Sequence, residues 1–555
     1  MDVLVSEKNQ LSEDFNESWE IYESLYECLR NESVFYKKPQ LLRHPLIFYY
    51  AHTASFYMNK LNAAGIIHRR INAEFDSLFA IGVDEMDWDE TYTEVHNWPS
   101  LNKVRKYRQS VKKIINEVID SLDYKMDYSF DSSHWVILMC IHHEKIHLET
   151  SSVLIRQLDL DDVISNRSYR PCQSNNSNAV QNSLISVPGG VISLGKEKDT
   201  HYGWDNEYGF KQSKVDSFKA SKYLVTNQEY LQFLEQDGYE SDEFWTVEGR
   251  LWKEKLQAKL PEFWVLRHGQ YFLRQLTSEI KLPLNYPVEV CYHEASAYCY
   301  WLSKQQGQTI RLPDEFEYRR MLEVSGLDSQ EALQSVKANW SLQQGASSCA
   351  VDINQHGDFF DLVGNVWQWN ETAIFPYDSF EPHPLYEDFS LPTFDNKHQL
   401  IKGGSWISSG NLTYLTCRYA FRKHFYQHAG FRYIVSDQEA YKMTEYYMDD
   451  EILSQYCEFH YGHQYFDVAN FPQKLVDILS AYIPDHARGK ALDLGCAVGR
   501  SSFELLQYYD QVDALDLSTR FINIGIMMQD QGEIRYLLKD EGACYSEQKK
   551  YLNDI

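Results

Sequence analysis

The sequence predicts a multidomain protein in which an α-helical bundle, a loop-rich α+β domain and a partial α/β segment follow one another. The chain has 555 residues, which exceeds what one hydrophobic core can serve and suggests roughly three or four domains. The pattern of apolar residues changes near residue 165 and again near residue 437. It is helical in the first stretch, mixed in the second, and strand–turn–helix in the third.

The first stretch, residues 1–165, predicts an antiparallel four-helix bundle. Apolar residues recur there at spacings of three and four, which is typical of amphipathic helices, in segments 11–31, 45–65, 101–122 and 132–158. The polar stretch that follows, residues 166–183, predicts a linker.

The middle stretch, residues 184–436, predicts an α+β domain, because it combines glycine pairs, short β-like runs and many Trp and Tyr residues. The last stretch, residues 437–555, contains KALDLGCAVGRSSFELLQYYDQVDALDLS from Lys490, which predicts strand, glycine turn, helix and strand. Only about 65 residues follow its first strand, and the polar tail from Glu541 shows no strand pattern. We therefore expect only a partial doubly wound domain.

Composition excludes several classes of function. The net charge of -27 repels phosphate backbones, so nucleic acid is not an expected partner. The sequence has no run of 18 apolar residues and no signal-peptide pattern at its acidic start, so we expect a cytoplasmic protein without a membrane segment. Its ten cysteines include no CxxC pair, which indicates reduced thiols rather than a zinc ribbon or a disulfide framework.

A candidate metal site lies in the fourth predicted helix. His143 and His147 are four residues apart, so both imidazoles lie on one helix face and can bind one ion. His52 sits in the middle of an apolar helix, where an imidazole is costly unless its nitrogens are satisfied. His142 points about 100° away and is expected at the surface or behind the site, and His134 could cap the helix. A single HxxxH pair is weak evidence, and imidazole ligands suit zinc, iron, copper or nickel.

The segment HEKIHLE (His143–Glu149) resembles the HxxxHxE signature of DinB-like bundles in the sulfoxide synthases of ergothioneine and ovothiol biosynthesis. The resemblance implies that His52, His143 and His147 bind Fe(II), that O₂ is a co-substrate, and that Glu149 is not a ligand. It replaces the two-histidine-one-carboxylate triad that the motif alone would suggest.

The middle stretch is similar to the formylglycine-generating-enzyme (sulfatase-modifying-factor) fold, which is C-type-lectin-like. Seven motifs occur in family order, namely PGG from Pro188, VTNQEYLQFL from Val225, PVEVCYHEASAYCYWL from Pro287, RLPDEFEYRR from Arg311, GNVWQW from Gly364, GGSW from Gly403 and AGFR from Ala429. Those enzymes use a pair of copper-binding cysteines. Here only Cys417 lies in the corresponding region, so copper chemistry is not expected.

The last stretch resembles a class I methyltransferase that uses S-adenosyl-L-methionine. Its glycine turn implies cofactor contacts from Asp493, Gly495 and Gly499, with Asp516 on the ribose. Since the segment is short, we expect at most cofactor binding, and methyl transfer is not expected. A bundle, this scaffold and such a segment in one chain is the arrangement of the ovothiol branch, the 5-histidylcysteine sulfoxide synthases.

That branch joins cysteine sulfur to an imidazole carbon of histidine and oxygenates the sulfur, as the first step of ovothiol biosynthesis. The resemblance implies an active-site tyrosine, for which Tyr377 fits the family register slightly better than Tyr386. It also implies arginines that bind the carboxylate of the thiol substrate, which is cysteine or a cysteine peptide. The candidates are Arg105 and Arg108, with Arg418 and Arg422 as further possibilities.

Three alternatives remain open on the sequence. One is an ergothioneine-type synthase that acts on trimethylhistidine. Another is a non-catalytic module, in which a metal-holding bundle and a lectin-like scaffold only bind a partner. The third is that S-adenosyl-L-methionine binding is the main activity.

Overall fold

The computed structural model describes residues 2–40, 43–80, 97–122, 130, 132–172, 179–198, 201–386, 389–442, 450–462, 464–465, 468–483, 489–541 and 544–554. The chain forms two compact units. The first unit comprises Met1–Glu387 and Lys397–Tyr441, and the second comprises Asp388–Asn396 and Lys442–Ile555. The candidate metal centre lies within the first unit.

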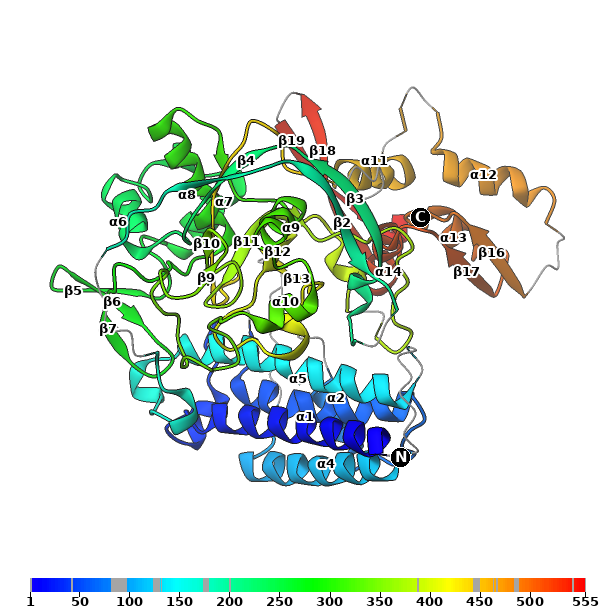
Figure 1. The fold of residues 1–555 in the computed structure, drawn as a ribbon. Coiled ribbons are helices and arrows are strands. Elements are labelled where there is room, and N and C mark those ends of the chain that lie inside the picture. Colours follow the sequence, from blue (N-terminus) through cyan, green and yellow to red (C-terminus); the bar gives the residue numbers. More distant parts are fainter. Residues whose placement is uncertain are drawn as a thin grey trace. The chain divides into compact units, whose positions relative to one another are not determined.

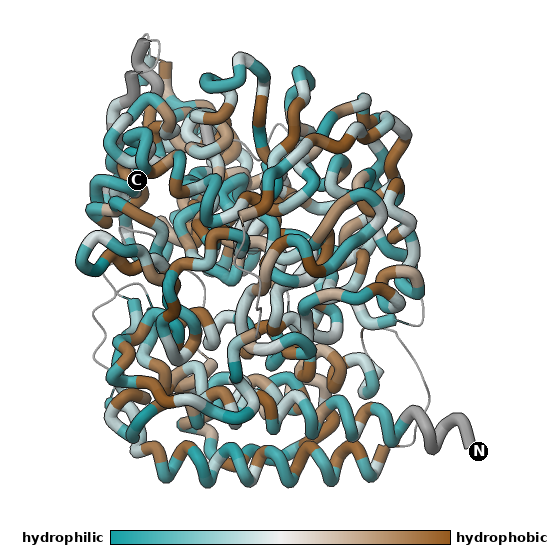
Figure 2. Tube along the Cα trace, turned by 60° about the vertical axis from the view of Figure 1, so that its left-hand side comes forward, coloured by the Kyte–Doolittle hydropathy of each residue, from teal (hydrophilic) through white to brown (hydrophobic). Residues whose placement is uncertain are grey.

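The first unit begins with a helical bundle (Figure 1). Its long helices are α1 (Asp2–Tyr26), α2 (Leu46–Ala63), α4 (Leu101–Ser121) and α5 (Ser133–Arg156), and the short α3 (Ala73–Leu78) follows α2. All four expected long helices are present, and α1 starts earlier than its apolar periodicity indicates. Figure 2 shows apolar and polar segments alternating along the bundle helices, as amphipathic packing requires.

The pattern of buried residues explains why these segments form the helices of a bundle. α4 buries one stripe at helical spacing, which includes Val104, Tyr107, Val111 and Ile115, and leaves its other face in solvent. α2 is buried from Leu46 to Met58, because other elements cover it on every side. At the start of α5, the side chain of Ser132 accepts a hydrogen bond from the Trp135 amide at 3.1 Å. Ser132 is therefore the N-cap, and the expectation that His134 caps this helix is wrong.

An α+β domain follows the bundle in the first unit. Its helices are α6 (Asn227–Glu235), α7 (Val247–Leu256), α8 (Tyr292–Gln306), α9 (Glu315–Val324) and α10 (Gln330–Ser335). Its strands are β1 (Leu184–Val187), β2 (Gly190–Lys196), β3 (Gly209–Val215), β4 (Phe218–Ser221), β5 (Trp264–Arg267), β6 (Gln270–Arg274), β7 (Glu279–Lys281), β8 (Ile310–Arg311), β9 (Gln355–His356), β10 (Phe359–Phe360), β11 (Trp367–Ala373), β12 (His398–Lys402), β13 (Tyr419–Arg422), β14 (Ala429–Gly430) and β15 (Ile434–Val435).

Several small sheets organise this domain. One four-stranded sheet has the order β1-β4-β15-β8, and another has the order β13-β12-β11-β14. β11 lies inside the second sheet, antiparallel to β12 and parallel to β14. β2 and β3 form a ribbon, as do β9 and β10, and β5, β6 and β7 form a meander. In Figure 1, α5 is the bundle helix that lies against this domain, so it can carry residues for both.

The second unit contains α11 (Asp450–Tyr461), α12 (Phe471–Ser480), β16 (Lys490–Leu494), α13 (Arg500–Leu505), β17 (Gln511–Leu515), α14 (Thr519–Gln531), β18 (Glu533–Glu541) and β19 (Cys544–Tyr551). β16 and β17 pair in parallel, which confirms the predicted strand–turn–helix–strand unit. The expectation that the tail has no strand is wrong, because β18 and β19 form an antiparallel hairpin. None of the described helices combines the length and apolar character that crossing a membrane requires.

Candidate metal centre

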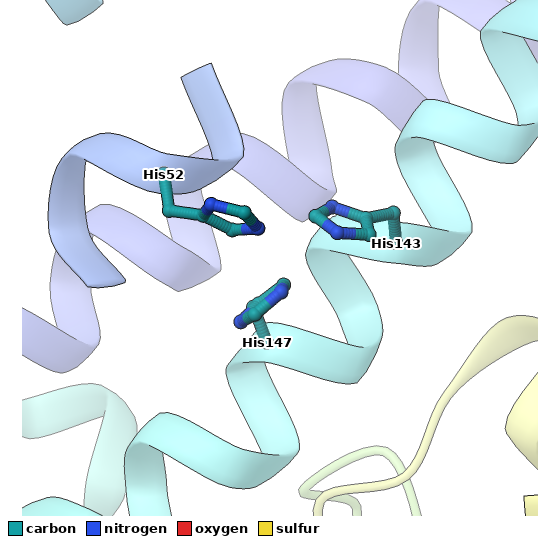
Figure 3. A group of neighbouring side chains, drawn as sticks. All are labelled: His52, His143 and His147. Carbon is teal, nitrogen blue, oxygen red and sulfur yellow. The ribbon is translucent and has the colours of Figure 1, made fainter. Parts of the chain in front are cut away.

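Three histidines from two helices meet inside the first unit (Figure 3). α2 supplies His52, and α5 supplies His143 and His147. The ring centroids of His52 lie 5.1 Å from His143 and 4.6 Å from His147, and those of His143 and His147 are 4.4 Å apart. One nitrogen of each ring lies within 4.8 Å of the others. A single ion can therefore be bound by all three imidazoles.

The hydrogen bonding of these rings suits metal ligands. Nδ1 of His52 lies 2.6 Å from the carbonyl oxygen of Phe79, which fixes the ring and leaves Nε2 for an ion. That Nε2, and Nδ1 of both His143 and His147, are buried without a hydrogen-bond partner in the part of the chain that the structure describes. Since buried polar atoms are nearly always satisfied, an unsatisfied nitrogen on each of three neighbouring imidazoles indicates a ligand.

Burial also keeps these imidazoles neutral. It lowers the pKa of His52 to about 4, although the Phe79 carbonyl opposes this shift. Burial likewise lowers the pKa of His143 and of His147 well below the usual value, and the neighbouring histidines add to the effect. A metal binds the neutral form of imidazole, so the site is ready for an ion without losing protons first.

Aromatic side chains surround the histidines. Phe48 stacks on His52 with centroids 5.3 Å apart, and Phe56 stacks on His143 at 3.5 Å. Tyr386, from the α+β domain, meets Phe56 edge-on at 5.0 Å, and its ring centroid is 6.1 Å from that of His143. The centre therefore has walls from both domains, which exclude water from the ligands.

Tyr377, the other tyrosine candidate, is engaged elsewhere. Its hydroxyl donates to Oε1 of Glu315 at 3.1 Å, and its ring lies 3.9 Å from the guanidinium of Arg418. Arg418 binds both carboxylate oxygens of Glu315 at 3.1 Å. The slight preference for Tyr377 over Tyr386 is thus not supported, because Tyr377 belongs to a buried ion-pair network in the α+β domain.

The other predicted arginines differ in position. Arg108 is buried in the bundle, where it donates to Glu23 at 2.6 Å and to Thr53 at 2.8 Å, and pairs with Glu144 at 3.6 Å. Arg105 is exposed, with its guanidinium 5.9 Å from the Phe35 ring. The predicted substrate fork of Arg105 and Arg108 is therefore not formed, and Arg108 instead links α4 to three other helices.

The guanidinium of Arg418 is also occupied by protein partners, since it binds Glu315 and the carbonyl oxygens of Asn206 and Phe375. Its predicted contact with substrate is not supported. Arg422 ends β13, where it is half-buried opposite His398.

Glu149 binds the α+β domain. Its Oε1 accepts hydrogen bonds from Trp367 Nε1 at 3.0 Å and Ser405 Oγ at 2.5 Å, and its Oε2 accepts one from Ser408 Oγ at 2.7 Å. Trp367 belongs to the GNVWQW motif and Ser405 to the GGSW motif. Three donors satisfy the carboxylate, so Glu149 anchors the ligand helix to the scaffold.

The same helix makes two further contacts with the scaffold. Arg156 binds Glu289 in two-pronged fashion, with Nη1–Oε2 at 2.5 Å and Nη2–Oε1 at 3.0 Å. His142 stacks on Tyr202 at 4.4 Å, and its Nδ1 accepts a hydrogen bond from the Asn411 amide at 3.3 Å. His142 is therefore a buried interdomain contact, so of its two expected positions, at the surface or behind the site, the one at the surface is wrong.

The second unit places the predicted cofactor residues in and around the turn after β16, with Asp493 in β16 and Asp516 just after β17. Gly495 and Gly499 adopt φ values of +78° and +90°, which favour glycine. Asp493 accepts a hydrogen bond from Ser502 Oγ at 2.7 Å. Asp516 accepts bonds from the amides of Ala497 at 2.9 Å and Ser518 at 2.8 Å. The turn is therefore formed, and its carboxylates bind neighbouring donors of the same unit.

Sequence reasoning missed two cationic residues near the centre. Lys60 of α2 lies with Nζ 4.1 Å from the Tyr386 ring centroid. Arg43, buried just before α2, lies 4.1 Å from the Phe425 ring centroid. Its charge adds to the effect of burial in lowering the pKa of His147. The spacing of His52, Phe56 and Lys60, four residues each, could have indicated Lys60.

The fold and the site define a multidomain protein with a DinB-like helical domain that carries the histidines and a sulfatase-modifying-factor-like α+β domain. Residues 14–151 match the DinB superfamily, and residues 171–437 match the sulfatase-modifying factor enzyme 1-like domain. Both matches agree with the resemblance inferred from the motifs.

Three named relatives are similar to this chain in sequence. Ergothioneine biosynthesis protein 1 of Schizosaccharomyces pombe is 26% identical over 434 residues, which cover 71% of this chain and 51% of that protein. Its namesake from Neurospora crassa is 22% identical over 71% of this chain and 54% of that protein. Hercynine oxygenase of Mycolicibacterium smegmatis is 25% identical over 52% of this chain and 68% of that protein. The chain thus spans about half the length of the two fungal relatives.

Proposed function

We propose that this protein is a mononuclear non-haem iron enzyme that uses O₂ to join a thiol sulfur to an imidazole carbon and oxygenates the sulfur. The observation that carries the proposal is the meeting of three buried, neutral imidazoles at one point beside Tyr386. The motif resemblance and the names of the relatives support the same chemistry.

The reaction balances without another reductant. The thiol and the imidazole carbon each lose a hydrogen, one oxygen atom of O₂ goes to sulfur, and the other leaves as water. Fe(II) held by His52, His143 and His147 would supply O₂ activation and an acidified thiol. Three nitrogen ligands leave room for substrates at the ion, which a closed structural zinc site does not.

The protein's own residues then orient the reactants. The Phe79 carbonyl fixes the His52 ring, and Phe56 fixes the His143 ring by stacking. Tyr386 is the favoured catalytic tyrosine, with its hydroxyl as a proton donor, because it contacts the aromatic wall of the centre. Tyr377 is the less favoured candidate, since Glu315 and Arg418 hold it.

Arg43 is the residue that we favour for binding the carboxylate of a substrate. It is buried just before α2, the helix that carries His52, and a guanidinium binds a carboxylate with two parallel hydrogen bonds. Replacing it with Lys would keep the charge and remove the fork. We expect the R43K variant to raise KM for the thiol roughly tenfold with a smaller change in kcat, measured by O₂ uptake.

The imidazole substrate has two candidates. The names of the relatives favour hercynine, the trimethylated form of histidine, and hence a step of ergothioneine biosynthesis. Plain histidine, and hence ovothiol biosynthesis, is the second candidate. The β16–α13–β17 unit favours it, because the ovothiol branch carries a methyltransferase-like segment.

One reconstitution tests both. Anaerobic protein receives Fe(II), equal amounts of histidine and trimethylhistidine, and cysteine or γ-glutamylcysteine, and then O₂. Mass spectrometry of the sulfoxide product shows which imidazole and which thiol are used. Protein that retains zinc and consumes no O₂ would contradict the proposal and favour the binding module.

A further inference from the structure

A tight turn of the α+β domain presents Tyr386 to the metal centre. The amide of Tyr386 donates to the carbonyl oxygen of His383 at 2.9 Å, and the amide of Leu385 donates to Nδ1 of the same histidine at 3.1 Å. These two bonds close residues 383–386 into one small unit. The position of the tyrosine therefore depends on what holds this turn.

The first residue of the turn is held by the start of α5. The His383 ring stacks on Trp135 with centroids 4.2 Å apart and planes 7° apart. Its Nε2 lies 2.9 Å from the carbonyl oxygen of Phe130, and because Nδ1 accepts, Nε2 is the donor. One end of the turn is thereby fixed to the bundle.

The other end of the turn is held by Lys60 of α2. Its Nζ donates to the carbonyl oxygen of Leu385 at 2.5 Å. The same ammonium lies 4.1 Å from the centroid of the Tyr386 ring and 5.1 Å from that of Phe56. One cation thus binds the backbone of the turn and the faces of two rings, and cation–π contacts are strongest where water is excluded.

The spacing along α2 makes this contact specific. His52, Phe56 and Lys60 occur at intervals of four residues, so they lie along one face of the helix. In order, that face offers a metal ligand, a ring that stacks on the second ligand, and the ammonium that holds the tyrosine turn. The tyrosine and the ligand are therefore positioned by the same rigid helix.

We infer that Lys60 is a positioning residue that holds Tyr386 against the metal centre and so directs the reaction toward carbon–sulfur coupling. The inference rests on the proposed function for its second half. Without coupling, the same thiol can take up both atoms of O₂ and form a sulfinate. A displaced Tyr386 should favour that product, because catalysis depends steeply on where the proton donor lies.

The first test measures whether the surroundings of Tyr386 change, in protein that contains no iron and catalyses no reaction. The tyrosine is replaced by 3-fluorotyrosine, and the ¹⁹F resonance is recorded in metal-free protein that carries Lys60→Met, Lys60→Arg or no further change. We expect K60M to shift or broaden the resonance and K60R to restore it. The matched control is K222M, because Lys222 also lies over two rings, 5.4 Å from Tyr223 and 5.3 Å from Phe360. A resonance that responds to both K60M and K222M, or to neither, overturns the inference.

The second test reads the product ratio in iron-loaded protein. K60M should lower the ratio of sulfoxide to sulfinate about tenfold, while K60R and K222M keep the wild-type ratio. An unchanged ratio in K60M overturns the directing role even if the resonance moves. If the wild-type protein forms no coupled product at all, the proposed function fails, and the fluorine comparison still decides whether Lys60 positions the tyrosine.

Discussion

The histidine pair of α5 and the glycine turn after β16 are two short motifs that the sequence shows equally clearly, but they differ in how far the surrounding residues bury them. The histidines lie in a buried centre that both domains of the first unit enclose. The strands beside the glycine turn expose Leu492 at 57%, Leu494 at 71% and Leu515 at 54%. Parallel strands are normally covered on both faces. The second unit has a small core that includes Val498 of the turn and Phe521 of α14, but these strand leucines lie outside it. The glycine turn is therefore less completely enclosed than the histidine centre.

The carboxylates of the two regions show the same contrast. Glu149 receives three hydrogen bonds from another domain, two of them from the GNVWQW and GGSW motifs. Asp516 receives its bonds from the turn beside it and from its own loop. Long-range bonds fix the ligand helix against a second domain, whereas local bonds only shape a turn.

The largest effect should come from a histidine ligand. We expect His147→Ala to lower iron affinity by more than about a hundredfold and to reduce O₂ uptake to background, because two imidazoles cannot close the site. Iron content after anaerobic reconstitution is the measurement. His68→Ala, at an exposed histidine, is the control and should bind iron normally. Stoichiometric iron with wild-type turnover in H147A would show that His147 is not a metal ligand and that the three histidines do not form the iron site.

The next effect concerns the ion pair between Arg156 and Glu289, which joins the two domains of the first unit. Burial raises the pKa of Glu289, but the charge of Arg156 and the hydrogen bonds outweigh it and hold the pKa at about 2. A lowered pKa stabilises the folded protein above the unfolded value near 4.5, and this contribution is lost as the pH falls toward 2.

Glu289→Gln should cost about 3–5 kcal/mol of unfolding free energy at pH 7, because Arg156 is then buried without a counter-charge. The acid loss of stability between about pH 4.5 and pH 2 should also become shallower. Urea unfolding at several pH values measures both. The control is Glu248→Gln, whose exposed pair with Lys423 should matter by less than about 1 kcal/mol. Equal effects of the two variants would show that the domain contact is not specially stabilised.

Much of the centre could be predicted from the sequence, because its information is local. The spacing of His143 and His147 follows from helix geometry, and the family motifs supplied His52. The four helices and the β16–α13–β17 unit were likewise visible as periodic patterns. These features depend on residues that are neighbours in the chain.

What the sequence could not show depends on contacts between distant segments. Arg108 was predicted to bind substrate, yet its buried partners Glu23, Thr53 and Glu144 come from three other helices. Register could not show that Tyr386 lies nearer the histidines than Tyr377, because that position depends on contacts between distant segments, such as the one between Lys60 and Leu385. The strand β19 was not predicted because its sequence, CYSEQKKY, is mostly polar, and it forms by pairing with β18.

A smaller effect should come from the anchor of α5. Glu149→Gln replaces one acceptor oxygen with an amide group that faces hydroxyl and indole donors, so we expect a loss of about 2–3 kcal/mol. Thermal unfolding and iron titration should both respond, since the ligand helix loosens from the scaffold. Glu117→Gln, at an exposed position of α4, should change neither. A lowered melting temperature with unchanged iron affinity would show that the anchor stabilises the domain contact and not the metal centre.

The smallest effect should come from replacing one glycine in each unit with alanine, at two positions of similar backbone conformation. Gly495 in the turn and Gly65 after α2 have φ values of +78° and +69°, and an added Cβ would meet nothing within 4 Å at either position. Each change to Ala should therefore cost about 1 kcal/mol, from backbone strain alone. Hydrogen exchange should show the loss only in the unit that carries the substitution, and G495A should leave iron content unchanged. If S-adenosyl-L-methionine protects the second unit from exchange and G495A removes that protection, the glycine turn is a working site despite its sparse cover, and the contrast with the histidine centre disappears.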